Sequence, residues 1–196
     1  MNIPNKLTVA RIVLAPLFLA VALLDFPHHY AVALAVFVAA ALTDMFDGKI
    51  ARARGLITNF GKFLDPLADK MLTTAAFLLF LVNGQMNVWA LMLVLTRDFM
   101  VTSVRLIAAK DGNVIAANLW GKAKTVAQFV AIIYTLAALE FAGWQTGLLA
   151  GYALPASVFS VPLVIGRVCI WISVVMTVIS GLDYVWLNRQ YFKNEK

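Results

Sequence analysis

Four aspartates stand in segments that are otherwise rich in apolar residues, TDMFDGKIARARG (43–55) and GKFLDPLADK (61–70). Asp44 and Asp47 are three residues apart, and Asp65 and Asp69 are four apart. On helices, both spacings place the two carboxylates of a pair on one face. If the two helices are consecutive and antiparallel, both pairs lie at the same end and can converge on one site.

The chemistry of such a site follows from its charge. An ionised carboxylate at the centre of a membrane helix costs roughly 2.5–3.5 kcal/mol, and four together also repel one another. Oxygen ligands without His or Cys nearby favour magnesium, calcium or manganese. Four carboxylates can bridge two such ions, which suits reactions of phosphates. The alternative is a rim of solvated aspartates paired with neighbouring lysines and arginines, since charges at the ends of spans reach water.

The elements that position these side chains are expected to be membrane helices. Of the 196 residues, 62% are hydrophobic and 13% are charged, whereas a soluble domain has about 25% charged residues. Continuous apolar runs of roughly 20 residues favour helices that cross a bilayer. We expect one all-α domain over residues 1–196, with spans at 7–25, 30–53, 60–82, 86–109, 121–141 and 161–187. The single cysteine, Cys169, excludes an internal disulfide.

The distribution of lysine and arginine orients these spans. The loops DFPHHY (25–30), NGQMN (83–87) and 140–160 contain neither residue type. By the positive-inside rule they face outward, so both termini and the four aspartates face the cytoplasm. The net charge of +6 then fits an anionic leaflet, and we expect no nucleic-acid partner. His28 and His29 fall in an outer loop and are expected to lie at the interface.

The two aspartate segments match the pattern Asp-x2-Asp-Gly-x2-Ala-Arg-x8-Gly-x3-Asp-x3-Asp at every specified position. In this pattern the chain resembles the CDP-alcohol phosphatidyltransferases. The stretches NIPNKLTVARIVLAP, TRDFMVTSVRLIAA and LWGKAKTVAQ are similar to one branch of that family, the bacterial phosphatidylglycerophosphate synthases. Arg97-Asp98 departs from the Arg-Glu of many members of the branch but keeps the charges. From about residue 140 onward no specific resemblance is present.

The resemblance implies a homodimeric six-helix enzyme of the bacterial inner membrane, with its active site at the cytoplasmic ends of the second and third spans. It would transfer the phosphatidyl group from CDP-diacylglycerol to glycerol 3-phosphate and release CMP. Asp69 would be the general base. Two Mg²⁺ or Mn²⁺ ions would be held by Asp44, Asp47, Asp65 and Asp69. The CDP group would contact Asp44, Gly48, Ala51, Arg52 and Gly61.

Because glycerol 3-phosphate carries a phosphate, a basic pocket is expected beside the metals. A helix that begins near WGKAKT (120–125) also attracts phosphate. For the two lysines of that segment, the alternative is ordinary positive-inside charge. For Arg105, the alternative is pairing with Asp98, seven residues earlier on nearly the same helix face. The candidates for the acceptor's phosphate are Arg11, Arg105, Lys122 and Lys124. Arg167 and Asp183 receive no role.

Two other functions stay open. A sister enzyme would have the same aspartates but another acceptor, namely inositol phosphate, serine or phosphatidylglycerol. A transporter of divalent cations or protons would use the carboxylates as a relay. Transporters place such sites near the middle of the bilayer, whereas these aspartates cluster at one end of their spans and the outer halves of the spans are apolar.

Overall fold

The computed structural model describes residues 3–54, 59–110, 118–145, 147–149, 151–152 and 154–189, with their side chains except at 3–8, 44–54, 59–67, 69 and 109–110. Over these ranges the protein is all-α, as predicted, and each expected span overlaps one helix. The helices are α1 (Ile3–Leu23), α2 (His29–Arg54), α3 (Asn59–Val82), α4 (Val88–Lys110), α5 (Leu119–Gly143) and α6 (Ala156–Leu187).

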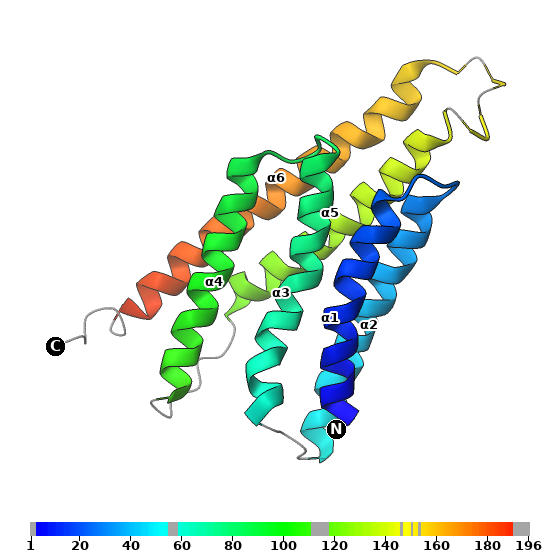
Figure 1. Cartoon of the computed structure of the whole chain (residues 1–196). Helices are drawn as coiled ribbons and strands as arrows, with labels where there is room; N and C mark the ends of the chain where they lie inside the picture. Colours follow the sequence, from blue (N-terminus) through cyan, green and yellow to red (C-terminus); the bar gives the residue numbers. More distant parts are fainter. Residues whose placement is uncertain are drawn as a thin grey trace.

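The helices run alternately up and down through the bundle (Figure 1). α1 packs against both α2 and α3, which also touch each other, while α5 packs against α6 and α2. α4 lies beside α6 and α3. The ends of α2 and α4 and the beginnings of α3 and α5 therefore lie toward the end of the bundle where α1 begins and α6 finishes (Figure 1). Because this end carries the aspartate segments, we call it the aspartate end.

Local signals define the helix boundaries at the opposite end. Gly84 has φ +66°, and the amide of Gln85 donates to the carbonyl of Phe80 at 2.8 Å. Together with the bond from the Gly84 amide to the Leu81 carbonyl, at 3.1 Å, this is a Schellman motif that ends α3. The side chain of Asn87 then accepts from the amide of Ala90 at 2.7 Å. Asn87 thus caps the start of α4.

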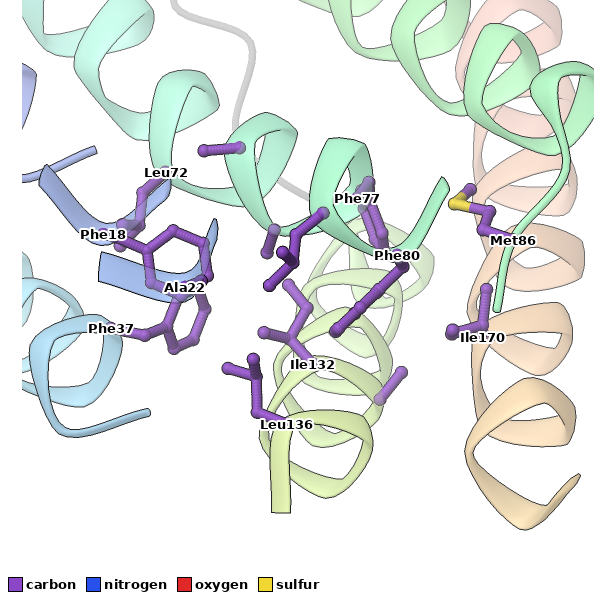
Figure 2. Packing of buried hydrophobic residues seen from close by; sticks show 14 of the residues in the cluster. Phe18, Ala22, Phe37, Leu72, Phe77, Phe80, Met86, Ile132, Leu136 and Ile170 are labelled. Carbon is purple, nitrogen blue, oxygen red and sulfur yellow. The ribbon is translucent and has the colours of Figure 1, made fainter. Parts of the chain in front are cut away.

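Aromatic side chains form the centre of the bundle, where α1, α2, α3 and α5 meet (Figure 2). The rings of Phe18 and Phe37 lie 5.8 Å apart at 59°, and Phe37 also contacts Phe129 of α5 with 5.7 Å between ring centroids. Small buried residues let the helix backbones approach one another, as is common in membrane helix packing. They include Ala15, Ala22, Ala33, Ala40 and Ala76.

The exposed face of α6 is strongly apolar, whereas part of its buried face is polar. On α6, Val168, Trp171 and Ile172 are exposed, whereas Ser173 and Thr177 are fully buried at 0% exposure. α5 and α6 are long and apolar enough to cross a membrane, judged by length and composition within the described ranges. Such an exterior is consistent with a membrane protein, because exposed apolar side chains carry no penalty in lipid.

The two histidines at the start of α2 contact the protein itself: His28 precedes the helix, and His29, its first residue, has its Nδ1 2.9 Å from the Phe26 carbonyl oxygen. His28 has φ +63°, and its Nδ1 lies 2.6 Å from Oε1 of Glu140 on α5. Glu140 also accepts hydrogen bonds from the Ala31 amide at 3.0 Å and from the Trp144 indole at 2.9 Å. Glu140 thereby connects the loop before α2 to the end of α5.

Candidate active site

The helix bounds place both aspartate pairs at matching distances from the hairpin between α2 and α3. Asp44 and Asp47 stand ten and seven residues before the end of α2 at Arg54, and Asp65 and Asp69 stand six and ten residues after the start of α3 at Asn59. At about 1.5 Å per residue, Asp44 and Asp69 lie about 15 Å along their helices from those ends. The prediction that all four lie on helices is confirmed. Their side chains lie outside the described ones, so their convergence on one site stays a prediction.

The positions predicted to contact the CDP group lie on the same two helices. Gly48, Ala51 and Arg52 belong to the last two turns of α2, and Gly61 belongs to the first turn of α3. Their side chains also lie outside the described ones, and their roles remain predictions. Among the described residues, no three His, Cys, Asp or Glu side chains gather closely enough to hold a metal ion.

A basic pocket of about 360 Å³ opens between α3, α4 and α5. Three of the predicted acceptor residues, Arg105, Lys122 and Lys124, line this pocket. Arg11 is not among its described lining residues; this residue of α1 is 5% exposed, and its predicted role stays untested. Within the described ranges, five cationic side chains and one carboxylate line the pocket, and this excess of positive charge favours the binding of an anion. The charged lining residues are Lys70, Arg97, Asp98, Arg105, Lys122 and Lys124.

Asp98 holds several of these cations in place. Nζ of Lys124 donates to its two carboxylate oxygens at 2.7 and 2.8 Å, and Nη1 of Arg97 donates to Oδ1 at 3.0 Å. Nζ of Lys70 lies 3.9 Å from Oδ2. Asp98 is 6% exposed and Lys124 only 2%, so Lys124 is not an ordinary surface charge. Lys122, on the same turn, is exposed.

Arg105 does not pair with Asp98 in this structure. Its guanidinium carbon lies over the ring of Tyr184, 5.7 Å from the ring centroid. The Nε atoms of both Arg105 and Arg97 are buried without a hydrogen-bond partner among the described residues. A buried cationic N–H without an acceptor is costly, and a bound anion in the pocket would relieve that cost.

An apolar groove of about 300 Å³ adjoins the basic pocket. It runs between α1, α3 and α4, and Ala15, Leu19, Leu78 and Phe99 are among its walls. Lys70 lines both the groove and the basic pocket, and it directly follows Asp69 in the sequence. A polar compartment and an apolar compartment therefore meet at Lys70, the residue that follows a predicted metal ligand in the sequence.

Three residues that line the basic pocket, Lys70, Arg97 and Asp98, are not among the predicted acceptor residues. The signal for Arg97 and Asp98 was present, because two charges inside the apolar stretch LMLVLTRDFMV are unusual in a membrane helix and are functional by default. Lys70 carried a weaker signal, since a lysine beside an aspartate pair also fits a simple charge balance.

Comparison with known proteins defines the class of the molecule. The family model "CDP-alcohol phosphatidyltransferase" matches residues 1–179. A Bacillus subtilis (strain 168) protein named CDP-diacylglycerol–glycerol-3-phosphate 3-phosphatidyltransferase is 36% identical over 204 residues, covering 98% of this chain and 97% of that protein. A probable phosphatidylglycerophosphate synthase of Mycobacterium tuberculosis (strain ATCC 25618 / H37Rv) is 39% identical over 188 residues, covering 94% of this chain and 80% of that protein.

A third relative, from Rickettsia bellii (strain RML369-C), has the same name as the Bacillus protein and is 31% identical over 97% of both chains. The helical bundle with its apolar exterior and basic pocket is therefore that of a phospholipid-synthesis transferase. The chain belongs to the CDP-alcohol phosphatidyltransferase family, which confirms the resemblance of its aspartate pattern.

Proposed function

We propose that this enzyme transfers the phosphatidyl group from CDP-diacylglycerol to glycerol 3-phosphate, giving phosphatidylglycerol phosphate and CMP. The observation that carries the choice of acceptor is the basic pocket, which includes Lys70, the residue after Asp69. A phosphate-bearing acceptor suits five cations and two buried guanidinium N–H groups without acceptors among the described residues. The names of the bacterial relatives support glycerol 3-phosphate over inositol phosphate.

Asp44, Asp47, Asp65 and Asp69 form a set of hard oxygen donors, which fits Mg²⁺ or Mn²⁺. We propose that they hold two such ions, which would neutralise the diphosphate of the donor and the charge on the leaving CMP. Gly48, Ala51, Arg52 and Gly61 would accept the cytidine diphosphate group along the same helices. These assignments rest on the family pattern and on the matching helix positions.

In the proposed reaction, Asp69 accepts the proton of the acceptor's hydroxyl. The hydroxyl oxygen then forms a bond to the phosphorus that carries diacylglycerol, and the bond from that phosphorus to the bridging oxygen of CMP breaks. Arg105, Lys122 and Lys124 hold the acceptor's own phosphate, which orients the hydroxyl for attack. The apolar groove beside Lys70 accepts part of the lipid donor. The water-soluble acceptor and the lipid donor therefore meet near Lys70, where the basic pocket adjoins the groove.

We also propose a homodimer in a bacterial inner membrane, with six spans and the aspartate end facing the cytoplasm. The bacterial relatives and the absence of Lys and Arg from the opposite loops support this orientation. A cation transporter would have no use for a basic pocket beside its acidic residues, so the structure gives no reason to prefer that alternative.

The test is CMP release by purified protein in detergent with CDP-diacylglycerol and an acceptor panel. We expect release with glycerol 3-phosphate and Mg²⁺ or Mn²⁺, and none after EDTA. Release with serine, inositol phosphate or phosphatidylglycerol, but not with glycerol 3-phosphate, would replace the proposed acceptor.

The general base is tested by Asp69→Asn, with Asp25→Asn at the opposite end of the bundle as the matched control. We expect Asp69→Asn to lose at least about 10²-fold in kcat, because a base and a metal ligand are removed together. Asp25→Asn should keep wild-type activity. An Asp69→Asn protein that folds normally and retains most of its turnover would remove Asp69 as the base.

A further inference from the structure

None of the described residues that line the basic pocket comes from α6, yet four positions near the end of α6 contact either residues that line it or Asn118, the N-cap of α5. These positions are Ser180, Gly181, Asp183 and Tyr184, of which all but Asp183 are buried. They lie beyond residue 179, where the family match ends, and the sequence offered no role for any of them.

Two of the four positions determine where Arg97 lies. Nη2 of Arg97 donates to Oγ of Ser180 at 2.6 Å. A Cβ atom at Gly181 would come within 2.7 Å of Cγ of Arg97, so the side chain of Arg97 crosses α6 where only glycine leaves room. The guanidinium is therefore held between Ser180 on one side and Asp98 on the other.

Asp183 acts on the first turn of α5. The side chain of Asn118 caps α5, because its Oδ1 accepts from the Gly121 amide at 2.8 Å. Its Nδ2 donates to Oδ2 of Asp183. Since a carboxylate can only accept, Asp183 keeps the amide of Asn118 turned so that its oxygen caps the helix. The first two turns of α5 carry Gly121, Lys122 and Lys124, which line the pocket.

Tyr184 supports the third element of the pocket. Its side chain is 3% exposed and lies in a small cluster with Val101 and Val104 of α4. Arg105 stacks over its ring at 5.7 Å, within the range of a cation–π contact. The Tyr184 ring therefore holds the Arg105 guanidinium in one position at the wall of the pocket.

We propose that Ser180, Gly181, Asp183 and Tyr184 form a positioning face on α6 that arranges the cations for the acceptor's phosphate without touching it. This inference rests on the proposed function of the pocket. A preorganised set of cations binds an anion more tightly, because the side chains lose less freedom on binding. The positioning face therefore controls the affinity for the acceptor and leaves the metal-binding helices α2 and α3 unchanged.

The test uses Ser180→Ala, Gly181→Ala and Asp183→Leu in the full-length protein. For each, KM is measured for glycerol 3-phosphate and separately for CDP-diacylglycerol. We expect KM for glycerol 3-phosphate to rise about tenfold, the equivalent of one well-placed hydrogen bond to a charged group, with KM for CDP-diacylglycerol unchanged. Asp183→Asn should restore the wild-type value, because its amide oxygen still accepts from Asn118.

Two substitutions on the same helix are matched controls. Ser173→Ala removes a buried hydroxyl that donates to the Ile170 carbonyl of its own helix at 2.7 Å. Gly166→Ala adds a methyl group against Thr135, whose Oγ1 would lie 3.0 Å from it. Ser173 and Gly166 lie about two and about four turns before Ser180 along α6, away from the residues of the basic pocket, so we expect wild-type KM values. If the wild type uses glycerol 3-phosphate but KM changes equally in test and control variants, the positioning face is wrong. The proposed function would then be unaffected.

A second measurement separates this inference from the proposed reaction. Thermal unfolding of wild type and variants is followed while inorganic phosphate is titrated, without any turnover. We expect phosphate to stabilise the wild type and the two control variants, but the three test variants only at about tenfold higher concentration. If the wild type fails to use glycerol 3-phosphate, the proposed function is wrong. In that case the positioning face stands only if the phosphate titration still separates test from control variants.

Discussion

A buried carboxylate with three cationic neighbours is the main electrostatic feature at the scale of single residues. Removing a carboxylate and an ammonium group from water is expensive, and the geometry must be good to offset that penalty. Asp98 meets this requirement, since Lys124 reaches both of its oxygens and Arg97 one of them. The cluster orders the lysine and arginine that the pocket presents to an anion.

Lys124→Met tests this cluster. The substitution leaves Asp98 buried with only Arg97 at 3.0 Å and Lys70 at 3.9 Å among its described cationic neighbours. We expect the free energy of unfolding to fall by about 2–4 kcal/mol, measured by denaturation in detergent. The double variant Asp98→Leu/Lys124→Met should regain most of that stability, because no unpaired carboxylate remains, while KM for glycerol 3-phosphate stays raised.

Lys122→Met is the control at a neighbouring position. Lys122 is exposed, so its removal should change stability by no more than about 0.5 kcal/mol. A Lys124→Met protein as stable as Lys122→Met would show that the bonds to Asp98 contribute little. A double variant with wild-type KM would show that Lys124 has no part in acceptor binding.

At the scale of the elements, the ends of the helices decide the shape of the bundle. α3 ends in a Schellman motif at Gly84, and α4 begins at the cap of Asn87. This short connection brings Arg97, Asp98 and Arg105 of α4 beside α3, so that they share a pocket with Lys70.

Gly84→Ala tests the turn without disturbing any packing. No described atom lies within 4 Å of a Cβ placed at Gly84, so the effect comes from the backbone alone. We expect a loss of about 1–2 kcal/mol of stability, the usual cost of a left-handed conformation for a residue with a Cβ. Gly84→Asn should lose less, because Asn tolerates that conformation.

Gly143→Ala is the matched control for Gly84→Ala. A Cβ placed at Gly143 would likewise have no described atom within 4 Å, but this glycine stands in the last turn of α5. Alanine there should be neutral or stabilising by up to about 1 kcal/mol. Equal losses of stability at the two glycines, measured by chemical denaturation, would contradict the role of Gly84.

At the scale of the whole molecule, apolar residues cover the outside and hydroxyl groups fill part of the inside. Trp171, Ile172 and Val175 face outward on α6, while Ser173, Thr177 and Ser180 face α5 or α4. Small polar residues let helices approach closely, and in lipid the apolar exterior carries no penalty. The apolar exterior predicts that the bundle lies in a membrane, and the charges of the loops predict its orientation there.

Labelling with a membrane-impermeant maleimide tests that orientation in a Cys169→Ala background. Cys169 is the only cysteine of the chain, so a single new cysteine reports one position. We expect Gly151→Cys, exposed in the α5–α6 loop, to react in intact cells or spheroplasts. Arg189→Cys, exposed after α6, should react only after the membrane is permeabilised. The reverse pattern would place the aspartate end outside.

From the order of the residues alone follow the all-α class, the approximate bounds of the six helices, the helical spacing of the aspartates and the family. These features are local: apolar run length, the spacing of side chains on one helix and a motif with fixed gaps all depend on residues close in the chain. The chemistry that a phosphate requires also grouped Arg11, Arg105, Lys122 and Lys124, of which all but Arg11 are among the described residues that line the basic pocket.

Which side chains face one another is evident only from the packing of the helices. Helical spacing allowed Arg105 to pair with Asp98. Instead, the Asp98 carboxylate accepts from Lys124, which lies 26 residues further along the chain on another helix. Likewise, only the packing of α6 against α4 and α5 gave Asp183 a partner. The periodicity of a helix shows which residues share a face, but not which helix covers that face, because neighbours are chosen by the fit of side chains that are distant in sequence.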